Sequence, residues 1–302
     1  VLQRNARLQV HVCRADGTEM PGFPVDLGPS SFAWMRSAAV VGDLDGDGTR
    51  EIVVGSYECK MFALDRRGVL RPGWPWQPPF PVIECGPIAL SELDGNRTLE
   101  VVVGGLLDGN PGGGLNGWSG VLWALGSNGQ PLPGWPQSYG WGTVSGTMVA
   151  DLDDDGHREI VIDSDLAGEI FNSNIRPYSV RGSEADGTPV AGFPRPTIVA
   201  LPNGLTNTAA VADFDGDGQL ELFWVSGKLL EDDGTHLARL YLWDLPAAVR
   251  RSPFDWPMYR HDAAHTGAQL GTTCAPGTCG LSLPFLDGFE SSSTAAWAPG
   301  PP

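Results

Sequence analysis

Short runs of β-branched and alternating apolar residues, separated by turn residues, recur along the chain. Between residues 33 and 78 the pattern predicts strands at 33–41, 51–56 and 60–65, and a fourth strand in the RPGWP segment at 71–75. Comparable sets begin near residues 87, 145 and 207, and residues 8–26 carry the last two strands of one more set. No window has a sustained helical period, so the sequence predicts an all-β fold.

Two motifs alternate through these sets. The first is GDLDGDGTREIVVGS at 42–56, which returns as ELDGNRTLEV at 92–101, DLDDDGHREI at 151–160 and DFDGDGQLEL at 213–222. The second is a turn that ends in an aromatic residue and a proline: DGTEMPGFP (16–24), RRGVLRPGWP (66–75), SNGQPLPGWP (127–136) and ADGTPVAGFP (185–194). Interleaved repeats of about 50–60 residues with four antiparallel strands each predict the blades of a β-propeller.

The repeats define the predicted domain organisation. We expect one propeller domain over residues 1–267, with full repeats near 33–78, 87–136, 145–196 and 207–257 and a partial blade at 8–26. Residues 268–302 are small, polar and proline-rich, which is typical of an irregular linker or tail.

The first motif has the chemistry of a loop that binds a hard cation. Ca²⁺ takes six to eight oxygen ligands, and a loop that curls around it offers side chains at positions one, three and five, a backbone carbonyl at seven and a later carboxylate, with glycine at six for the turn. Three loops fit this pattern from position one to position nine. They are Asp43, Asp45, Asp47, Gly48, Thr49 and Glu51; Asp151, Asp153, Asp155, Gly156, His157 and Glu159; and Asp213, Asp215, Asp217, Gly218, Gln219 and Glu221.

The second loop departs from the pattern. Its predicted ligands are Glu92, Asp94, Asn96, Thr98 and Glu100, and Arg97 replaces the turn glycine. The guanidinium of Arg97 could neutralise the loop by itself, so the sequence predicts three calcium sites and a fourth, degenerate one. All four loops lack the bidentate glutamate at position twelve that closes an EF-hand, and they continue as strands.

These residues resemble the FG-GAP/VCBS repeats of integrin-α-like β-propellers. DLDGDGxxEIVVG followed by DGxxxPGWP carries the resemblance over about residues 8–257, and WPMYRHDAAHTG (256–267) resembles the segment that ends many bacterial propellers of this kind. The resemblance implies a calcium loop between the first two strands of each blade, an extracellular location and a ring of about seven blades. Four full blades and a partial one fall short of that ring, so we expect further N-terminal blades; closure with five blades is the alternative.

Charge and cysteine content narrow the choice of partners. The net charge is −17, and the four loops hold 16 of the 36 acidic residues, which makes nucleic acid and anionic membranes poor partners. No apolar run approaches the length of a membrane span. The sequence shows no signal peptide and begins at Val1 in mid-pattern, which suggests a processed or truncated product. Cys274 and Cys279 bracket a short loop typical of a disulfide; propeller geometry allows a second bridge between Cys59 and Cys85, with Cys13 left free.

The predicted function is that of an extracellular ligand-binding or adhesion module, for protein or glycan, in which Ca²⁺ is structural. Insertions at 106–120 and 164–177 predict long loops on the face opposite the calcium loops. They supply the candidate ligand-binding residues Asn110, Asn116, Trp118, Asn172 and Asn174. The sequence shows no catalytic cluster: HDAAH (261–265) only echoes a zinc motif, and GWSGV (117–121) lacks the last glycine of a nucleophile elbow. The alternative functions are a polysaccharide-lyase-like propeller and an accessory domain of a larger secreted hydrolase.

Overall fold

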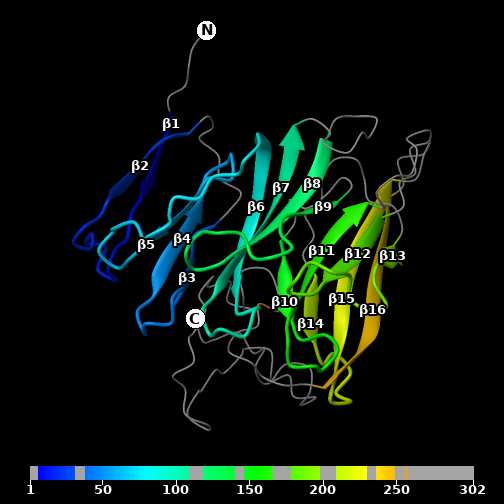
Figure 1. The fold of residues 1–302 in the computed structure, drawn as a ribbon. Coiled ribbons are helices and arrows are strands. Elements are labelled where there is room, and N and C mark those ends of the chain that lie inside the picture. Colours follow the sequence, from blue (N-terminus) through cyan, green and yellow to red (C-terminus); the bar gives the residue numbers. More distant parts are fainter. Residues whose placement is uncertain are drawn as a thin grey trace, which may run out of the picture.

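The structure, a computed structural model, describes residues 6–30, 38–108, 118–139, 146–165, 178–197, 209–229, 236–248 and Trp256. Within these residues the chain is all-β, as the sequence predicts, and its strands form five antiparallel sheets that follow one another in chain order (Figure 1). No helix in the described part of the chain is long and apolar enough to cross a membrane.

The five sheets have two, three, four, four and three strands. The first pairs β1 (Ala6–Val10) with β2 (Val25–Ser30). The second contains β3 (Val40–Gly42), β4 (Glu51–Gly55) and β5 (Met61–Leu64). The third contains β6 (Val82–Ser91), β7 (Glu100–Asp108), β8 (Trp118–Leu125) and β9 (Gln137–Tyr139). The fourth contains β10 (Met148–Ala150), β11 (Glu159–Asp165), β12 (Tyr178–Ser183) and β13 (Arg195–Thr197). The fifth contains β14 (Ala210–Ala212), β15 (Gln219–Leu229) and β16 (His236–Ala248).

The five sheets follow the order of the predicted repeats, but the second and fifth sheets have three strands instead of the predicted four, and the fourth strand lies later in the chain than predicted. The RPGWP type of segment is a turn, and the fourth strand follows its proline: β2 begins after Pro24, β9 after Pro136 and β13 after Pro194. Each of these prolines, like Pro75, follows a cis peptide bond. A proline has no backbone N–H to donate to a ladder, so pairing starts beyond it.

The first strand of the second full repeat and the two insertions also differ from the prediction. β6 begins at Val82 rather than near 87, and it carries two bulges before it settles into register with β7. β7 extends to Asp108 and β8 starts at Trp118, so the ends of the predicted loop 106–120 are strand and the two residues face each other across the ladder. β11 likewise extends to Asp165. Residues 109–117 and 166–177 lie outside the described residues.

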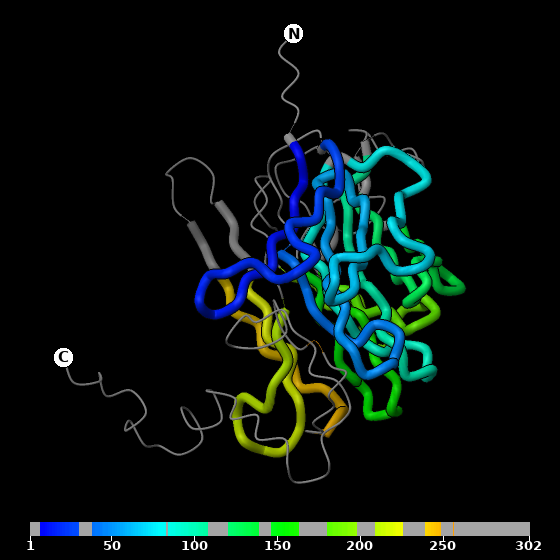
Figure 2. Tube along the Cα trace, turned by 90° about the vertical axis from the view of Figure 1, so that its left-hand side faces the viewer, coloured from blue at the N-terminus to red at the C-terminus, as the bar shows by residue number. Residues whose placement is uncertain are grey.

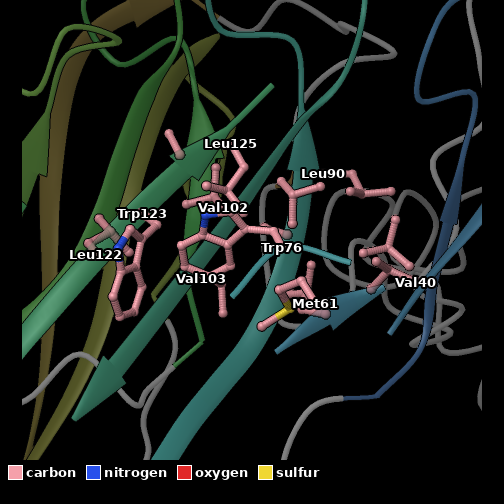
Figure 3. Close-up of a cluster of buried hydrophobic side chains, with 14 of the residues drawn as sticks. Val40, Met61, Trp76, Leu90, Val102, Val103, Leu122, Trp123 and Leu125 are labelled. Carbon is pink, nitrogen blue, oxygen red and sulfur yellow. The ribbon is translucent and has the colours of Figure 1, made fainter. Parts of the chain in front are cut away.

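The main hydrophobic core lies between neighbouring sheets. Figure 3 shows Val40 and Met61 of the second sheet facing Leu90, Val102 and Trp123 of the third, with Trp76 among them. The rings of Trp76 and Trp123 meet edge to face at 5.4 Å. A second core joins the fourth and fifth sheets, and a third joins the first and second. Burial of apolar faces between successive sheets therefore holds the repeats together.

The copies of the second motif at 66–75 and 127–136 fasten their repeats to the next one. The indole N–H of Trp74 donates to the Ser127 carbonyl at 2.9 Å, and that of Trp135 to the Ala185 carbonyl at 2.7 Å. The preceding glycines let the two backbones meet, because a Cβ on Gly73 or Gly134 would lie about 2 Å from a carbonyl oxygen of the next repeat. These tryptophans therefore pack between repeats.

Two long-range links complete the fold. Trp256 exchanges two backbone hydrogen bonds with Val149 of β10, at 2.9 and 2.7 Å, and is buried in the main core. Cys59, just before β5, forms a disulfide with Cys85 inside β6. In Figure 1 the first sheet (blue) and the last sheet (yellow to orange) lie at opposite ends of the row of sheets, and in Figure 2, which looks along that row, both lie toward the left. In the described residues the sheets do not close into a ring.

Candidate metal centres

Each acidic loop joins the first strand of a sheet to the second. In each loop, at least three carboxylates offer oxygen atoms that all lie within 4.8 Å of one another, so each group could hold a metal ion. The groups are Asp43, Asp45 and Glu51; Glu92, Asp94 and Glu100; Asp151, Asp153 and Glu159; and Asp213, Asp215, Asp217 and Glu221. The structure therefore brings together carboxylates that the sequence places at positions one, three and nine.

A recurring set of local hydrogen bonds shapes the loops. The glutamate at position nine accepts a bond from the backbone N–H of position two: Leu44 to Glu51 at 2.9 Å, Leu93 to Glu100 at 2.7 Å and Leu152 to Glu159 at 2.6 Å. Phe214 and Glu221 make the same bond at 2.5 Å. The leucine at position two is buried in the first three loops. The apolar residue inside the acidic stretch thus anchors the loop and fixes its last carboxylate.

The aspartate at position one closes the turn. Its Oδ2 accepts a bond from the N–H of the glycine at position six: Gly48 to Asp43 at 2.9 Å, Gly156 to Asp151 at 3.0 Å and Gly218 to Asp213 at 3.1 Å. These glycines have φ values of 87°, 91° and 87°, which L-residues rarely adopt. Arg97 takes the same left-handed conformation in the second loop, with φ at 70°. The substitution therefore keeps the turn.

Burial makes the position-nine glutamates unusual acids. Glu51, Glu100, Glu159 and Glu221 are each at most 1% exposed. Burial, opposed by the position-two hydrogen bond and reinforced by neighbouring carboxylates, raises the pKa of Glu51 to about 7 and those of Glu100 and Glu159 to about 8. Burial also raises the pKa of Glu221. Each loop thus holds an acid that a nearby cation would ionise.

Several carboxylate oxygens in the loops are buried and have no hydrogen-bond partner among the residues that the structure describes. The atoms are Asp43 Oδ1, Asp45 Oδ1, Glu92 Oε1, Asp153 Oδ1 and Glu159 Oε1. Buried polar atoms in native proteins nearly always have partners, and a partnerless carboxylate oxygen is costly. Because these atoms belong to the same groups that converge within 4.8 Å, a cation among them would satisfy several at once. The donor set fits a hard divalent ion.

The residues at positions five and seven are used differently. Asp47 lies outside the first group, and its carboxylate accepts bonds from the backbone N–H and hydroxyl of Thr49. Asp155 accepts the His157 N–H at 2.7 Å, and Asn96 accepts the Thr98 N–H at 2.7 Å. Asp217 also accepts the N–H of Gln219, at 2.8 Å, yet belongs to the fourth group.

Two arginines reach the acidic groups from outside, and sequence reasoning missed both. Arg71, from the second motif of the same repeat, pairs with the Asp45 carboxylate of the first loop. Arg158, at position eight of the third loop, lies 3.5 Å from Glu92 of the second. The strand pattern gives no signal for either pair, because each contact depends on how turns of different elements meet in space.

The remaining predicted site residues fall largely outside the described part. Asn110, Asn116, Asn172, Asn174, Cys274 and Cys279 lie outside the described residues. Trp118 is the first residue of β8, directly opposite Asp108, rather than a residue of a loop. Cys13 is free and exposed, and Cys59 and Cys85 are bonded to each other.

Comparison with models of known protein families and with curated proteins finds no match for this chain. The acidic loops and their geometry are therefore the main indication of what the protein does.

Proposed function

We propose that this chain is a calcium-binding β-propeller of the FG-GAP/VCBS type that acts outside the cell as a ligand-binding or adhesion module, with structural Ca²⁺. The observation that carries the metal part is Glu159: it is fully buried, one oxygen is held by Leu152, and the other has no partner within a cluster of carboxylates. Such a group needs either a proton or a cation.

Calcium is the divalent ion that best suits the chemistry of these loops. The groups offer only oxygen ligands on short loops, without the nitrogen or sulfur that zinc selects. Asp151, Asp153 and Glu159 would hold the ion in the third loop, and the equivalent carboxylates would hold it in the first and fourth. A bound ion would supply positive charge to carboxylates that otherwise repel, and would cross-link position one to position nine across the turn.

The proposal of a binding module is supported by the separation between the acidic loops, at one end of the strands, and the positions where the insertions begin, at the other end. In the third sheet the acidic loop precedes Glu100 at one end of β7, whereas Asp108 at the other end leads into the insertion. A strand of nine residues spans roughly 30 Å. Loops at that opposite end can vary without disturbing the metal groups, which is how binding sites are commonly carried on rigid scaffolds.

An extracellular setting is supported by the Cys59–Cys85 disulfide and by the charge. Disulfides persist mainly in oxidising compartments. A net charge of −17 disfavours nucleic acids, so we propose extracellular proteins or polysaccharides as partners.

Calorimetric titration of chelator-stripped protein with Ca²⁺ tests the metal part. We expect three sites and a rise in melting temperature on binding, since the ion binds only the folded loops. Asp45→Ala should remove one site and leave the others. No heat of binding, together with a melting temperature that a chelator does not change, would overturn the proposal.

A glycan array run in parallel with a pectin-cleavage assay tests the binding part. Retention of a glycan without cleavage supports a binding module. Release of unsaturated oligosaccharides would instead establish the polysaccharide-lyase alternative.

A further inference from the structure

The second acidic loop faces an arginine from the third. Arg158 Nη1 lies 3.5 Å from Glu92 Oε2 and 3.4 Å from the Glu92 backbone carbonyl. Both side chains are about nine-tenths buried, with 11% and 10% exposed. A buried ion pair of this kind is costly to break by removing one partner, because the other charge is left uncompensated.

The second loop is otherwise built like its neighbours. Arg97 adopts the left-handed turn, Glu100 accepts the Leu93 N–H, and Glu92, Asp94 and Glu100 converge within 4.8 Å. The difference lies at position one. Asp43, Asp151 and Asp213 bond back to the glycine at position six, whereas the longer Glu92 extends toward Arg158.

We propose that Arg158 is the resident cation of the second loop, so that this loop takes no divalent ion and is tied to the third loop instead. This inference rests on the proposed calcium binding of the first, third and fourth loops. A guanidinium already neutralises Glu92, and a divalent ion in the same group would be repelled by it. Asn96 at position five further lowers the negative charge that would attract a metal.

The position of Arg158 couples the two loops. It lies between His157 and Glu159, at positions seven and nine of the third loop. Once a calcium ion orders that loop, Arg158 is held where Glu92 needs it. The second loop in turn touches the first through a backbone bond from Leu99 to Leu44 at 3.0 Å. The metal-free loop would then act as a bridge between two metal-bearing ones.

Calorimetric Ca²⁺ titration of three stripped proteins tests this inference. The wild type should bind three ions, and Arg158→Gln should bind four because the second group loses its built-in cation. Arg50→Gln is the matched control, since Arg50 occupies position eight of the first loop and is exposed; it should still bind three. Four ions in the wild type, or three in folded Arg158→Gln, would overturn the inference.

Two further variants decide the matter if Arg158→Gln does not fold. Asp94→Ala removes a carboxylate of the second group and should leave the wild-type number at three; a fall by one ion would show that the second loop binds metal. The double variant Glu92→Gln/Arg158→Gln removes both charges and should melt well above the single Arg158→Gln variant. An equal or lower melting temperature would refute the pair. A wild type that binds no calcium at all would refute the proposed function, a result distinct from one that binds four.

Discussion

At the scale of the residue, the position-nine glutamate is the group on which the loops depend. Leu152 donates its N–H to one oxygen of Glu159 and leaves the other facing Asp151 and Asp153. Glu51 and Glu100 accept the same backbone bond, from Leu44 and Leu93. At Glu51 and Glu159, burial favours the protonated acid and a bound cation would favour the ionised one, so metal and proton would compete for these side chains.

The competition predicts opposite pH responses for stripped and calcium-loaded protein. In the stripped protein, the pKa values of Glu51, Glu100 and Glu159 rise from 4.5 to about 7 or 8, so the folded state binds more protons than the unfolded state between these values. Stability is then greatest below pH 4.5 as far as these groups are concerned, and falls as the pH rises to about 8.

Differential scanning calorimetry from pH 5 to 8 checks this response. The melting temperature of stripped protein should fall across the range, whereas calcium affinity should increase as protons leave the glutamates. A calcium affinity independent of pH in this window would contradict the assignment of Glu51 and Glu159 as ligands.

Arg71 predicts a second residue-scale effect. Its guanidinium pairs with Asp45, a carboxylate that a metal in the first loop would share. Arg71→Gln should raise the calcium affinity of one site by about tenfold, since a competing positive charge is removed. Isothermal titration with Arg66→Gln as the control, an exposed arginine in the neighbouring turn, makes the comparison. An unchanged affinity would mean that the arginine moves aside at no cost.

At the scale of the element, the second motif is a docking device between repeats. Gly73 and Gly134 sit where no side chain fits, and the adjacent Trp74 and Trp135 donate to carbonyls of the next repeat. Sheet faces supply most of the apolar burial, and these turns fix the relative position of the sheets. Two motifs therefore divide the work: one holds the first pair of strands, and the other holds neighbouring repeats.

A pair of glycine substitutions separates docking from backbone strain. Gly134→Ala combines a positive φ with a Cβ 2.0 Å from the Asp186 carbonyl oxygen, so it should cost about 3 kcal/mol of unfolding free energy. Gly17→Ala has a similar φ and no atom within 4 Å of the Cβ, so it should cost only about 1 kcal/mol. Urea unfolding in saturating calcium measures both. Equal losses would show that the close approach is not rigid.

At the scale of the whole molecule, the acidic loops lead into one end of β7 and β11, and the chain enters the insertions from the other end of each strand. Asp108 and Trp118 are directly paired across β7 and β8, so an Asn-Gly turn can replace residues 109–117 without changing the register. We expect this deletion to abolish binding of any glycan found on the array while calcium affinity and melting temperature stay nearly unchanged.

Asp151→Ala is the complementary variant. It should lower the number of calcium ions by one and leave glycan binding in place at saturating calcium. Glycan binding that survives the deletion, or that is lost in a folded Asp151→Ala protein, would place the ligand at the other end.

The sequence alone determined the features that depend on neighbours along the chain. The strands, the acidic turns and the left-handed glycines follow from residue type and spacing, because the bonds that shape each loop close within nine residues, as between Leu44 and Glu51. The prolines correctly indicated turns, but the fourth strand was wrongly predicted within the motif. A proline has no N–H to donate, so strand pairing starts only after it.

Only the tertiary structure decided which charges meet. Arg158 and Glu92 are 66 residues apart, and Trp74 and Ser127 are 53 apart. Contacts of this kind depend on how far one sheet is shifted along the next when the two pack together. The alternation of apolar residues does not determine this shift, because it specifies which face of a strand is buried and not the position along that face. The Arg71–Asp45 pair, closer in sequence, likewise depends on where a turn folds back. The shape of each acidic loop is thus determined by nearby residues in the sequence, whereas the arginines that pair with its carboxylates are brought there by tertiary packing.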